Sequence, residues 1–307
     1  MEQLFFGIDG GGTQSRLGIC DENGHIRGVV KGGSTNMYAA GFDTACANIR
    51  ALLKKVKEEC RIDIRDCAAG CFASAGVSTE SEKDNFRRFF EAEGLRCPLH
   101  ICNDALAALA GGTGKPEGII IISGTGSIAA GLDGCGRTVR AGGLGHLISD
   151  EGSGFCIGLE GMKAAAAAAE RRGMPTVLEM MLFEHYQIES IRELFPFLYT
   201  QFDKPRIASF APAVFTAARR KDRVALAIVE NAAKDLSLLA YSVYSRLFEG
   251  KKTEAVLSGG VFEHDPAFAR KTAAYISEAL PPVQVIPRRF DAVTGACILA
   301  RTQAAEI

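Results

Sequence analysis

An internal repeat sets the strongest limit on how this chain folds. In each copy an apolar strand leads into a glycine-rich turn, a second strand, a turn that starts at Asp, and a third strand that ends before Gly-Gly. We expect strands over residues 4–8, 13–20 and 25–31, and again over 118–122, 127–132 and 137–140. The glycine turns align at an offset of 114 residues, with Gly10 on Gly124, Gly12 on Gly126 and Thr13 on Ser127. One hairpin arises easily by chance, but two matching copies predict a duplicated α/β architecture.

Helical sequence follows each copy. Residues 42–60 place apolar side chains at a 3.6-residue period, which predicts an amphipathic helix. Residues 154–170 contain six consecutive alanines, which favour a helix that packs closely against a neighbour. We expect further helices over 176–186, 190–199, 205–219, 222–248 and 292–304, and late strands over 255–257 and 283–286.

Length and composition narrow the class of protein. A chain of 307 residues is long enough for two lobes, each with its own core. The formal net charge is −1 and no long basic run occurs, so a nucleic-acid partner is not expected. Hydrophobic residues make up 47% and charged residues 23%, as in folded globular proteins. No apolar run approaches the roughly 20 residues of a membrane helix, and no cationic segment precedes an apolar one at the N-terminus, so we expect a cytoplasmic protein without a membrane partner.

The ten cysteines are spread along the chain without a Cys-x-x-Cys motif. We expect them to be reduced and mostly to act as small buried hydrophobic residues. Cys and His do not cluster at the spacing of zinc ligands, so a zinc site is disfavoured.

The first glycine turn, residues 9–13, reads Asp-Gly-Gly-Gly-Thr. Glycines at Gly11 and Gly12 allow backbone N–H groups to approach a phosphate closely, Thr13 adds a hydroxyl group, and the Asp9 carboxylate can hold a hydrated metal cation. A plain tight hairpin needs only one or two glycines, so the extra glycine and the acid favour an anion site.

The second turn, residues 123–127, reads Ser-Gly-Thr-Gly-Ser and has no acid. Gly124, Thr125 and Gly126 are predicted to hold phosphates from the opposite side. The segment also fits the dinucleotide pattern Gly-x-Gly-x-x-Ala, but that pattern requires a helix next, and a strand is expected here.

Asp104 follows an apolar strand end and lies in the first turn of an expected helix. The helix dipole and free N–H groups are expected to favour its ionised form, which suits a base that takes a proton from a substrate hydroxyl group. An ordinary acid in a first helical turn is the alternative interpretation.

Three further segments are candidates for ligand contact. Residues 142–154 hold five glycines and two adjacent acids, a composition that lets backbone approach a ligand. Asn36 closes the first copy and offers one donor and one acceptor group. Gly259 and Gly260 follow a late strand and form a possible nucleoside platform. His146 and His264 stand alone and are interpreted as structural.

Taken together, these segments resemble the N-acetylglucosamine kinase branch of the BadF/BadG/BcrA/BcrD ATPase family, within the actin-like sugar kinases. The resemblance covers nearly the whole chain. It rests on IDGGGT at 8–13, GGSTN at 32–36, NDALAAL at 103–109, SGTGS at 123–127, GGLGHLISDEGSG at 142–154, LSGG at 257–260 and DAVTGACILA at 291–300.

The resemblance implies two ribonuclease-H-like lobes with an interlobe cleft that holds ATP and Mg²⁺. Residues 1–115 with 291–307 would form the N-terminal lobe, and 116–290 the C-terminal lobe with a helical insertion. Asp9 would lie near Mg²⁺, and both glycine turns would hold the phosphates. Asp104 would be the base, and Gly259 and Gly260 would flank the adenosine. The residues implied to contact the sugar are Asn36, Asp104, Gly143 and Asp150. A homodimer is a family expectation.

Two departures from the family loop concern the acceptor. The loop often carries Trp and Gly where this chain has Leu144 and Ser149, which changes the wall near the sugar. The sequence therefore predicts an ATP-dependent amino-sugar kinase acting on N-acetylglucosamine at its 6-hydroxyl, with N-acetylmuramate or glucosamine as alternative acceptors.

An ATPase switch that acts on a protein partner is the alternative from a different class. Dehydratase activators of this family bridge an iron–sulfur cluster through paired cysteines, and no matching arrangement occurs here. A transcription regulator of the same fold is disfavoured because no helix-turn-helix precedes Phe5.

Overall fold

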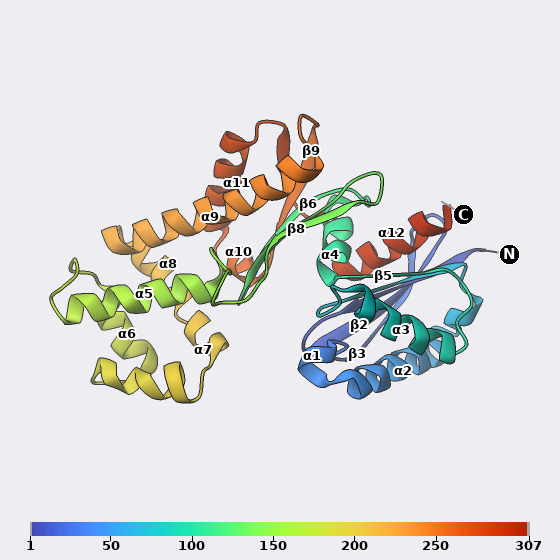
Figure 1. Cartoon of the computed structure of the whole chain (residues 1–307), viewed down its shortest axis with the longest axis horizontal. Coiled ribbons are helices and arrows are strands. Elements are labelled where there is room, and N and C mark those ends of the chain that lie inside the picture. The colour runs from blue at the N-terminus through green and yellow to red at the C-terminus, as the bar shows by residue number, and fades with distance from the viewer. Residues whose placement is uncertain (1, 306–307) are drawn as a thin grey trace. The chain divides into compact units, whose positions relative to one another are not determined.

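The computed structural model describes residues 2–305 as two five-stranded sheets with helices packed against them, and a group of helices between residues 154 and 219 that pack on one another (Figure 1). The strands are β1 Leu4–Gly10, β2 Gln14–Asp21, β3 Ile26–Gly33, β4 Ala69–Ser74, β5 Leu99–Cys102, β6 Gly118–Ser123, β7 Ser127–Leu132, β8 Thr138–Gly142, β9 Thr253–Ser258 and β10 Val283–Ile286. The α-helices are α1 Met37–Ala40, α2 Phe42–Glu59, α3 Glu80–Ala92, α4 Asp104–Thr113, α5 Gly154–Ala169, α6 Leu178–Tyr186, α7 Lys204–Ala208, α8 Ala211–Arg219, α9 Arg223–Leu247, α10 Gly260–His264, α11 Pro266–Ala279 and α12 Ala292–Ala305. Short 3₁₀ turns cover η1 Ile64–Asp66 and η2 Ile191–Leu194, and a π turn covers η3 Pro196–Thr200.

The two sheets have the same strand order. The first runs β3-β2-β1-β4-β5, and the second, read in the matching direction, runs β8-β7-β6-β9-β10. In the first sheet β2 pairs antiparallel with β1 and β3, whereas β1, β4 and β5 run parallel. The predicted repeat and the predicted α/β fold of two ribonuclease-H-like lobes are therefore confirmed.

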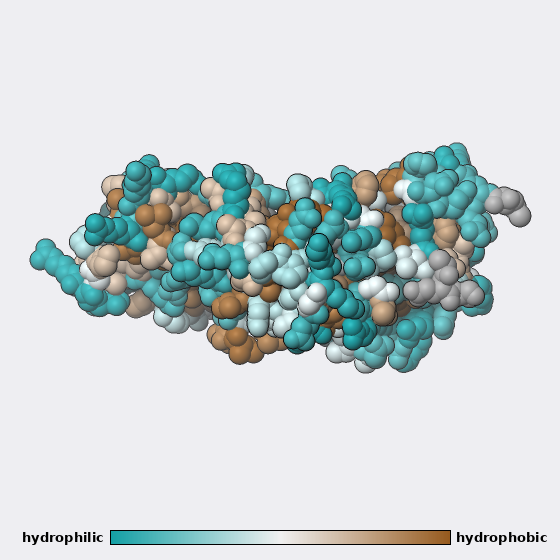
Figure 2. Space-filling view, turned by 90° about the horizontal axis from the view of Figure 1, so that it is seen from above, coloured by the Kyte–Doolittle hydropathy of each residue, from teal (hydrophilic) through white to brown (hydrophobic). Residues whose placement is uncertain are grey.

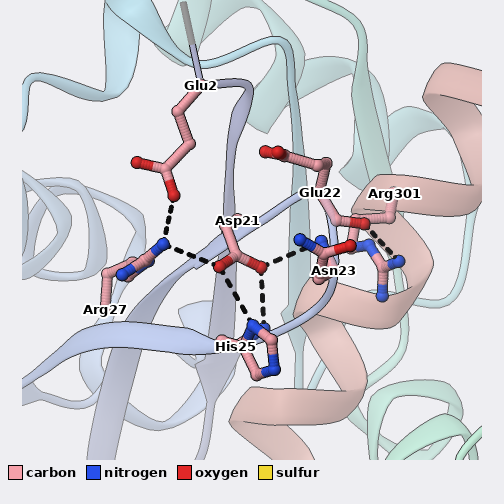
Figure 3. Close-up of polar contacts among 7 residues, drawn as sticks. All are labelled: Glu2, Asp21, Glu22, Asn23, His25, Arg27 and Arg301. Carbon is pink, nitrogen blue, oxygen red and sulfur yellow. Dashed lines mark hydrogen bonds and ion pairs between the residues drawn. The ribbon is translucent and has the colours of Figure 1, made fainter.

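The hairpin turns of the two copies also match in detail. Asp21 accepts hydrogen bonds from the N–H groups of Asn23 and His25, both at 2.9 Å, and pairs with Arg27 (Figure 3). Asp133 in the second copy accepts from Cys135 at 3.0 Å and Arg137 at 2.9 Å. The same Asx-type turn thus closes both hairpins.

Contacts divide the chain into two compact units. The first comprises the residues up to 120, residues 130–138 and the residues from 286 onward, and the second comprises 121–129 and 139–285. The strands β6 and β7 contribute to both units. The final segment of the chain therefore belongs with its beginning.

Alternation along β1 directs side chains to two layers of the first unit. Phe6 and Ile8 point into the apolar cluster formed with α2 and α3, where the buried aromatic rings include Phe72, Phe86 and Phe90. On the other face α12 packs against β1 and α4. Gly7 makes that approach possible, because a Cβ there would lie 2.5 Å from the backbone N of Cys297.

The predicted helix over 42–60 is confirmed as α2, whose buried side chains repeat at the expected period. The alanine-rich helix is α5, which packs against α6, α7, α8 and α9. It approaches a neighbour closely at a glycine: a Cβ at Gly158 would lie 2.3 Å from the carbonyl oxygen of Ile207.

Two helix predictions in the second unit are wrong. Residues 190–199 form a 3₁₀ turn and a π turn, because Pro196 has no N–H to continue an α-helix. The single helix expected over 205–219 is two helices, α7 and α8, separated at Ser209 and Phe210. Pro212 sits at the start of α8, a position where its missing N–H is tolerated.

The face in Figure 2 is covered mainly by hydrophilic side chains, with apolar residues in separate patches. Within residues 2–305, every helix is too short or too polar to cross a membrane.

Candidate active site

In the first unit, the candidate residues gather where parallel strands end. Asp9 lies near the end of β1. Asp104 is the first residue of α4, two residues after β5 ends. The loop after β4 joins them: the N–H of Ala75 donates to the carbonyl oxygen of Gly10 at 2.8 Å, and the Asn103 side chain donates to that of Val77 at 3.3 Å. Because parallel strands end at one edge of the sheet, residues distant in sequence become neighbours.

Asp9 forms an ion pair with an arginine side chain. The guanidinium group of Arg16 contacts Oδ2 of Asp9 at 2.8 Å and Oδ2 of Asp291 at 2.8 Å. Asp291 lies just before α12, where it also accepts from the N–H of Thr294 at 3.0 Å. The first glycine turn and the last helix are thus joined through one arginine.

The segment GGSTN, residues 32–36, forms hydrogen bonds with the first glycine turn and the strands beside it. The Ser34 hydroxyl group donates to the carbonyl oxygen of Gly11 at 3.0 Å. Thr35 lies in a fully buried chain of hydroxyl groups with Ser15, at 3.0 Å, and Ser74, at 3.3 Å. Sequence reasoning missed this network, although the motif itself was noticed.

Asn36 caps α1. Its Oδ1 accepts hydrogen bonds from the N–H groups of Tyr38 at 2.9 Å and Ala39 at 3.3 Å. The acceptor that the sequence analysis offered to a ligand is therefore engaged by the helix, and the amide NH₂ group is the donor available for such a contact.

Asp104 is electrostatically unusual. Burial and, secondarily, the negative charge of Asp9 raise the pKa of Asp104 to about 6. The expectation that the helix start would favour the ionised form is wrong in its net direction, because desolvation outweighs the hydrogen bond from Ala105. A carboxyl group with this pKa suits proton transfer near neutral pH.

The second glycine turn is tied to the loop that precedes α5. The Ser123 hydroxyl group donates to the carbonyl oxygen of Gly152 at 2.8 Å, and that of Ser127 to Glu151 at 2.7 Å. The N–H of Gly154 donates to the carbonyl oxygen of Gly124 at 2.8 Å. Two segments that the sequence analysis singled out separately therefore form one structure.

Asp150 is buried within this structure. Its Oδ1 accepts from the N–H of Ser127 at 3.1 Å, and its Oδ2 contacts Nζ of Lys204 at 2.6 Å. Gly143, in the same loop, has a φ of 69°, and a Cβ there would lie 2.9 Å from Ile128. Lys204 was not predicted from the sequence, which offers no signal for it.

A pocket of about 350 Å³ adjoins the second turn. Gly124 and Thr125 line it together with Gly154 and Gly260. Gly259, just before, lies against Ser123, since a Cβ there would be 2.4 Å from the carbonyl oxygen of that residue. The structure thus brings the predicted phosphate turn and the predicted nucleoside platform to one pocket.

The remaining wall of this pocket was missed from the sequence. It comes from α7, α8 and the α10–α11 junction and includes Pro205, Ala208, Ser209, Ala211, Pro212, Phe215, Thr216, Arg219, Val261, His264 and Asp265. Arg219 pairs with Asp265, and the Arg219 guanidinium also donates to Thr216 at 2.9 Å. His264 has the structural hydrogen bond expected of it, to the carbonyl oxygen of Gly260 at 2.6 Å, yet it also lines the pocket.

His146 stacks on Phe202, with ring centroids 4.6 Å apart. This contact agrees with a structural role for the residue.

A resident all-protein metal centre is not present among residues 2–305, where no group of three or more His, Cys, Asp or Glu side chains could hold a metal ion. Mg²⁺ in phosphate-transfer sites usually takes one or two carboxylates and completes its shell with phosphate oxygens and water. Asp9 fits that chemistry, because its oxygen-donor carboxylate lies at an anion-binding type of turn and is 19% exposed.

The chain has two sheets with the same strand order and a glycine turn at the equivalent place in each. This arrangement is the actin-like ATPase fold, of the kind found in sugar kinases. A Chromobacterium violaceum protein described as a candidate N-acetylglucosamine kinase shares it, with a TM-score of 0.71, 22% identity, and coverage of 97% of this chain and 98% of that one. The chain belongs to the BadF/BadG/BcrA/BcrD ATPase family, whose model matches residues 6–300.

Curated relatives match over nearly their full length. An N-acetylmuramic acid/N-acetylglucosamine kinase of Clostridium acetobutylicum is 31% identical, and the alignment covers 97% of this chain and 98% of the relative. An N-acetyl-D-glucosamine kinase of Dictyostelium discoideum is also 31% identical, with the same coverage.

Proposed function

We propose that the protein is an ATP-dependent amino-sugar kinase that transfers the γ-phosphoryl group to the 6-hydroxyl of N-acetylglucosamine. The observation that carries the proposal is a glycine turn at the equivalent place in each of two sheets with the same strand order, with Asp9 and Asp104 at the strand ends of the first sheet. The raised pKa of Asp104 supports it. The names of the curated relatives supply the substrate class.

Asp104 is proposed as the general base. With a pKa of about 6, its carboxylate is mostly ionised at pH 7 and above, yet basic enough to accept the hydroxyl proton as the oxygen attacks phosphorus. Phosphoryl transfer otherwise depends on positioning and charge stabilisation, so a single base is sufficient.

The pocket of the second unit is proposed to bind the nucleotide. Its volume suits a nucleoside, and Gly124 and Thr125 at its wall would present backbone N–H groups to the phosphates. Gly126 completes that turn, and Gly259 and Gly260 would flank the adenosine.

The first glycine turn is proposed to act on the same phosphates during transfer. Gly11, Gly12 and Thr13 would contact them, and Asp9 would provide a carboxylate ligand to Mg²⁺. When bound, Mg²⁺ would neutralise charge on the phosphate oxygens. Arg16 keeps the Asp9 carboxylate in a fixed orientation through its contact with Oδ2.

For the sugar, we propose contacts from Asn36, Gly143 and Asp150 in addition to Asp104. Asp150 would use a lone pair left free by its contacts with the Ser127 N–H and Lys204. The amide NH₂ group of Asn36 would donate to a hydroxyl or acetyl oxygen, since its Oδ1 caps α1. N-acetylmuramate is the second candidate acceptor, favoured by the name of the Clostridium relative. Leu144, 58% exposed where the family often has Trp, leaves room for a larger sugar.

Three further predictions accompany this proposal. We propose that the protein works in the cytoplasm, where ATP is available and thiols stay reduced, which suits a chain with ten free cysteines. We also retain the sequence-based lobe boundaries at 115/116 and 290/291, and a homodimer, which light scattering would test.

The test is ADP release by the purified protein with Mg²⁺ and ATP, comparing N-acetylglucosamine, N-acetylmuramate, glucosamine, N-acetylmannosamine, glucose and no sugar. Strong stimulation by one amino sugar would establish the kinase and identify its acceptor. Hydrolysis that no sugar stimulates would instead favour the ATPase switch, which measurement of bound iron would then examine.

A further inference from the structure

The ion pair between Lys204 and Asp150 is the most deeply buried charge pair close to the nucleotide pocket. The side chain of Asp150 is 3% exposed and that of Lys204 is 25% exposed, with 2.6 Å between Nζ and Oδ2. Asp150 also has a positive φ of 72°, which a non-glycine residue adopts only where surrounding contacts hold it.

This pair connects two walls of the pocket. Through Oδ1, Asp150 accepts the N–H of Ser127, the last residue of the turn whose Gly124 and Thr125 line the pocket. Lys204 begins α7, and the next residue, Pro205, lines the same pocket. The pair therefore lies directly behind the proposed phosphate-binding turn.

Lys204 offsets the negative charge of the buried Asp150 carboxylate. A buried carboxylate without a partner is strongly unfavourable, and beside a triphosphate it would also repel the ligand. Pairing with an ammonium group removes the net charge and leaves Oδ1 able to hold the turn.

We infer that Lys204 is a positioning residue for the nucleotide phosphates: it neutralises Asp150, so that this carboxylate can hold the Ser127 N–H without repelling ATP. The inference rests on the proposed function, because it takes the turn at 123–127 as the phosphate site. It assigns Lys204 no contact with the reacting atoms.

The test is calorimetric binding of a non-hydrolysable ATP analogue and of adenosine to Lys204→Met. The analogue should bind at least tenfold more weakly than to the wild-type protein, and adenosine should bind within twofold, since it carries no phosphate. Lys163→Met is the matched control: its ammonium pairs with Glu160 at the surface of α5, and both ligands should bind as to the wild type.

A second variant removes both charges. In Asp150→Asn/Lys204→Met no carboxylate is left unpaired, so the analogue should bind within threefold of the wild type even though Lys204 is missing. Lys204→Arg, which keeps the charge, should give the same result. These two variants keep the inference testable if Lys204→Met alone does not fold.

The possible results distinguish failure of the inference from failure of the proposed function. Equal weakening of analogue and adenosine by Lys204→Met would mean that Lys204 only supports the wall of the pocket, and unchanged affinity would mean that the charge is irrelevant; either overturns the inference. A tenfold loss that persists in the double variant also overturns it. If the wild-type protein itself binds no ATP analogue, the proposed function fails first.

Discussion

The two glycine turns have the same topology but different electrostatic surroundings. In the first, Asp9 stands at the turn, pairs with the partly exposed Arg16, and raises the pKa of Asp104. In the second, the turn has no acid of its own, and the carboxylate beneath it, Asp150, is buried and paired with Lys204. The two copies thus share a backbone, and under the proposed function the side chains around it suit one copy to proton and metal chemistry and the other to holding a ligand.

The comparison is tested most strongly by Asp104→Asn. Removing the proposed base should lower kcat by about 100-fold or more, while the affinity for ATP, which we propose depends on the second turn, changes less than threefold. Steady-state kinetics and calorimetric ATP binding measure the two effects. Asp66→Asn, an exposed acid of the first unit, is the control. Turnover close to that of the wild type would remove Asp104 from its role.

Alanine substitutions at paired glycines compare the two turns directly. A Cβ at Gly10 would lie 2.0 Å from Oγ1 of Thr35, and one at Gly126 would lie 2.8 Å from Oδ1 of Asp150, whereas at Gly12 and Gly124 it would meet nothing within 4 Å. Gly10→Ala and Gly126→Ala should lower the free energy of unfolding by about 2 kcal/mol, as overpacking does. Gly12→Ala and Gly124→Ala should change it by less than about 0.5 kcal/mol.

Urea unfolding without nucleotide measures all four variants. A loss at Gly12 or Gly124 as large as at its partner would contradict the packing described for the turns.

The pH dependence of kcat/KM should follow the ionisation of Asp104, whereas the nucleotide affinity should not. Since Asp104 has a pKa of about 6 and is proposed to act as its carboxylate, kcat/KM should fall about tenfold per pH unit below pH 6, while nucleotide affinity stays nearly level down to pH 5. A profile that is flat between pH 5 and 7 would exclude this base.

The same raised pKa predicts the direction of a stability effect. The folded state binds this proton more tightly than the unfolded state, whose Asp pKa is about 3.9, so the group favours folding more as the pH falls through about 6. Asp104→Asn should therefore raise the Tm at pH 8 by more than at pH 5.

Asn36→Asp should affect only the sugar. A carboxylate oxygen can still cap α1, but the NH₂ donor is lost, so the KM for the sugar should rise about tenfold while the KM for ATP and the Tm change little. Asn85→Asp on α3 is the control. Equal changes in both KM values would place Asn36 outside the sugar site.

Sequence reasoning reached the repeat and most strands because glycine turns and β-rich runs are local signals. It placed Gly124 and Gly260 as parts of one ligand site, and the structure brings both to one pocket. It did not find Lys204, Arg219 or Asp265, because their partners lie 46 to 54 residues away and no local pattern links them.

The electrostatics were the least predictable part. The helix start at Asp104 is visible in the sequence, and it suggested a favoured carboxylate. Burial, together with the charge of Asp9 almost a hundred residues earlier, reverses that direction. Both causes exist only once the fold brings the carboxyl ends of β1 and β5 to the same side of one sheet.

The placement of α12 has a consequence for synthesis of the chain. This helix covers the Gly7 face of β1 and packs on α4, so residues 292–305 complete a unit that begins with the first strand. During translation the second unit, whose residues end at 285, has its whole sequence before the first does. The first sheet can therefore acquire its α12 cover only after the whole second unit has been synthesised, and removal of residues 292–305 would expose that face of the sheet.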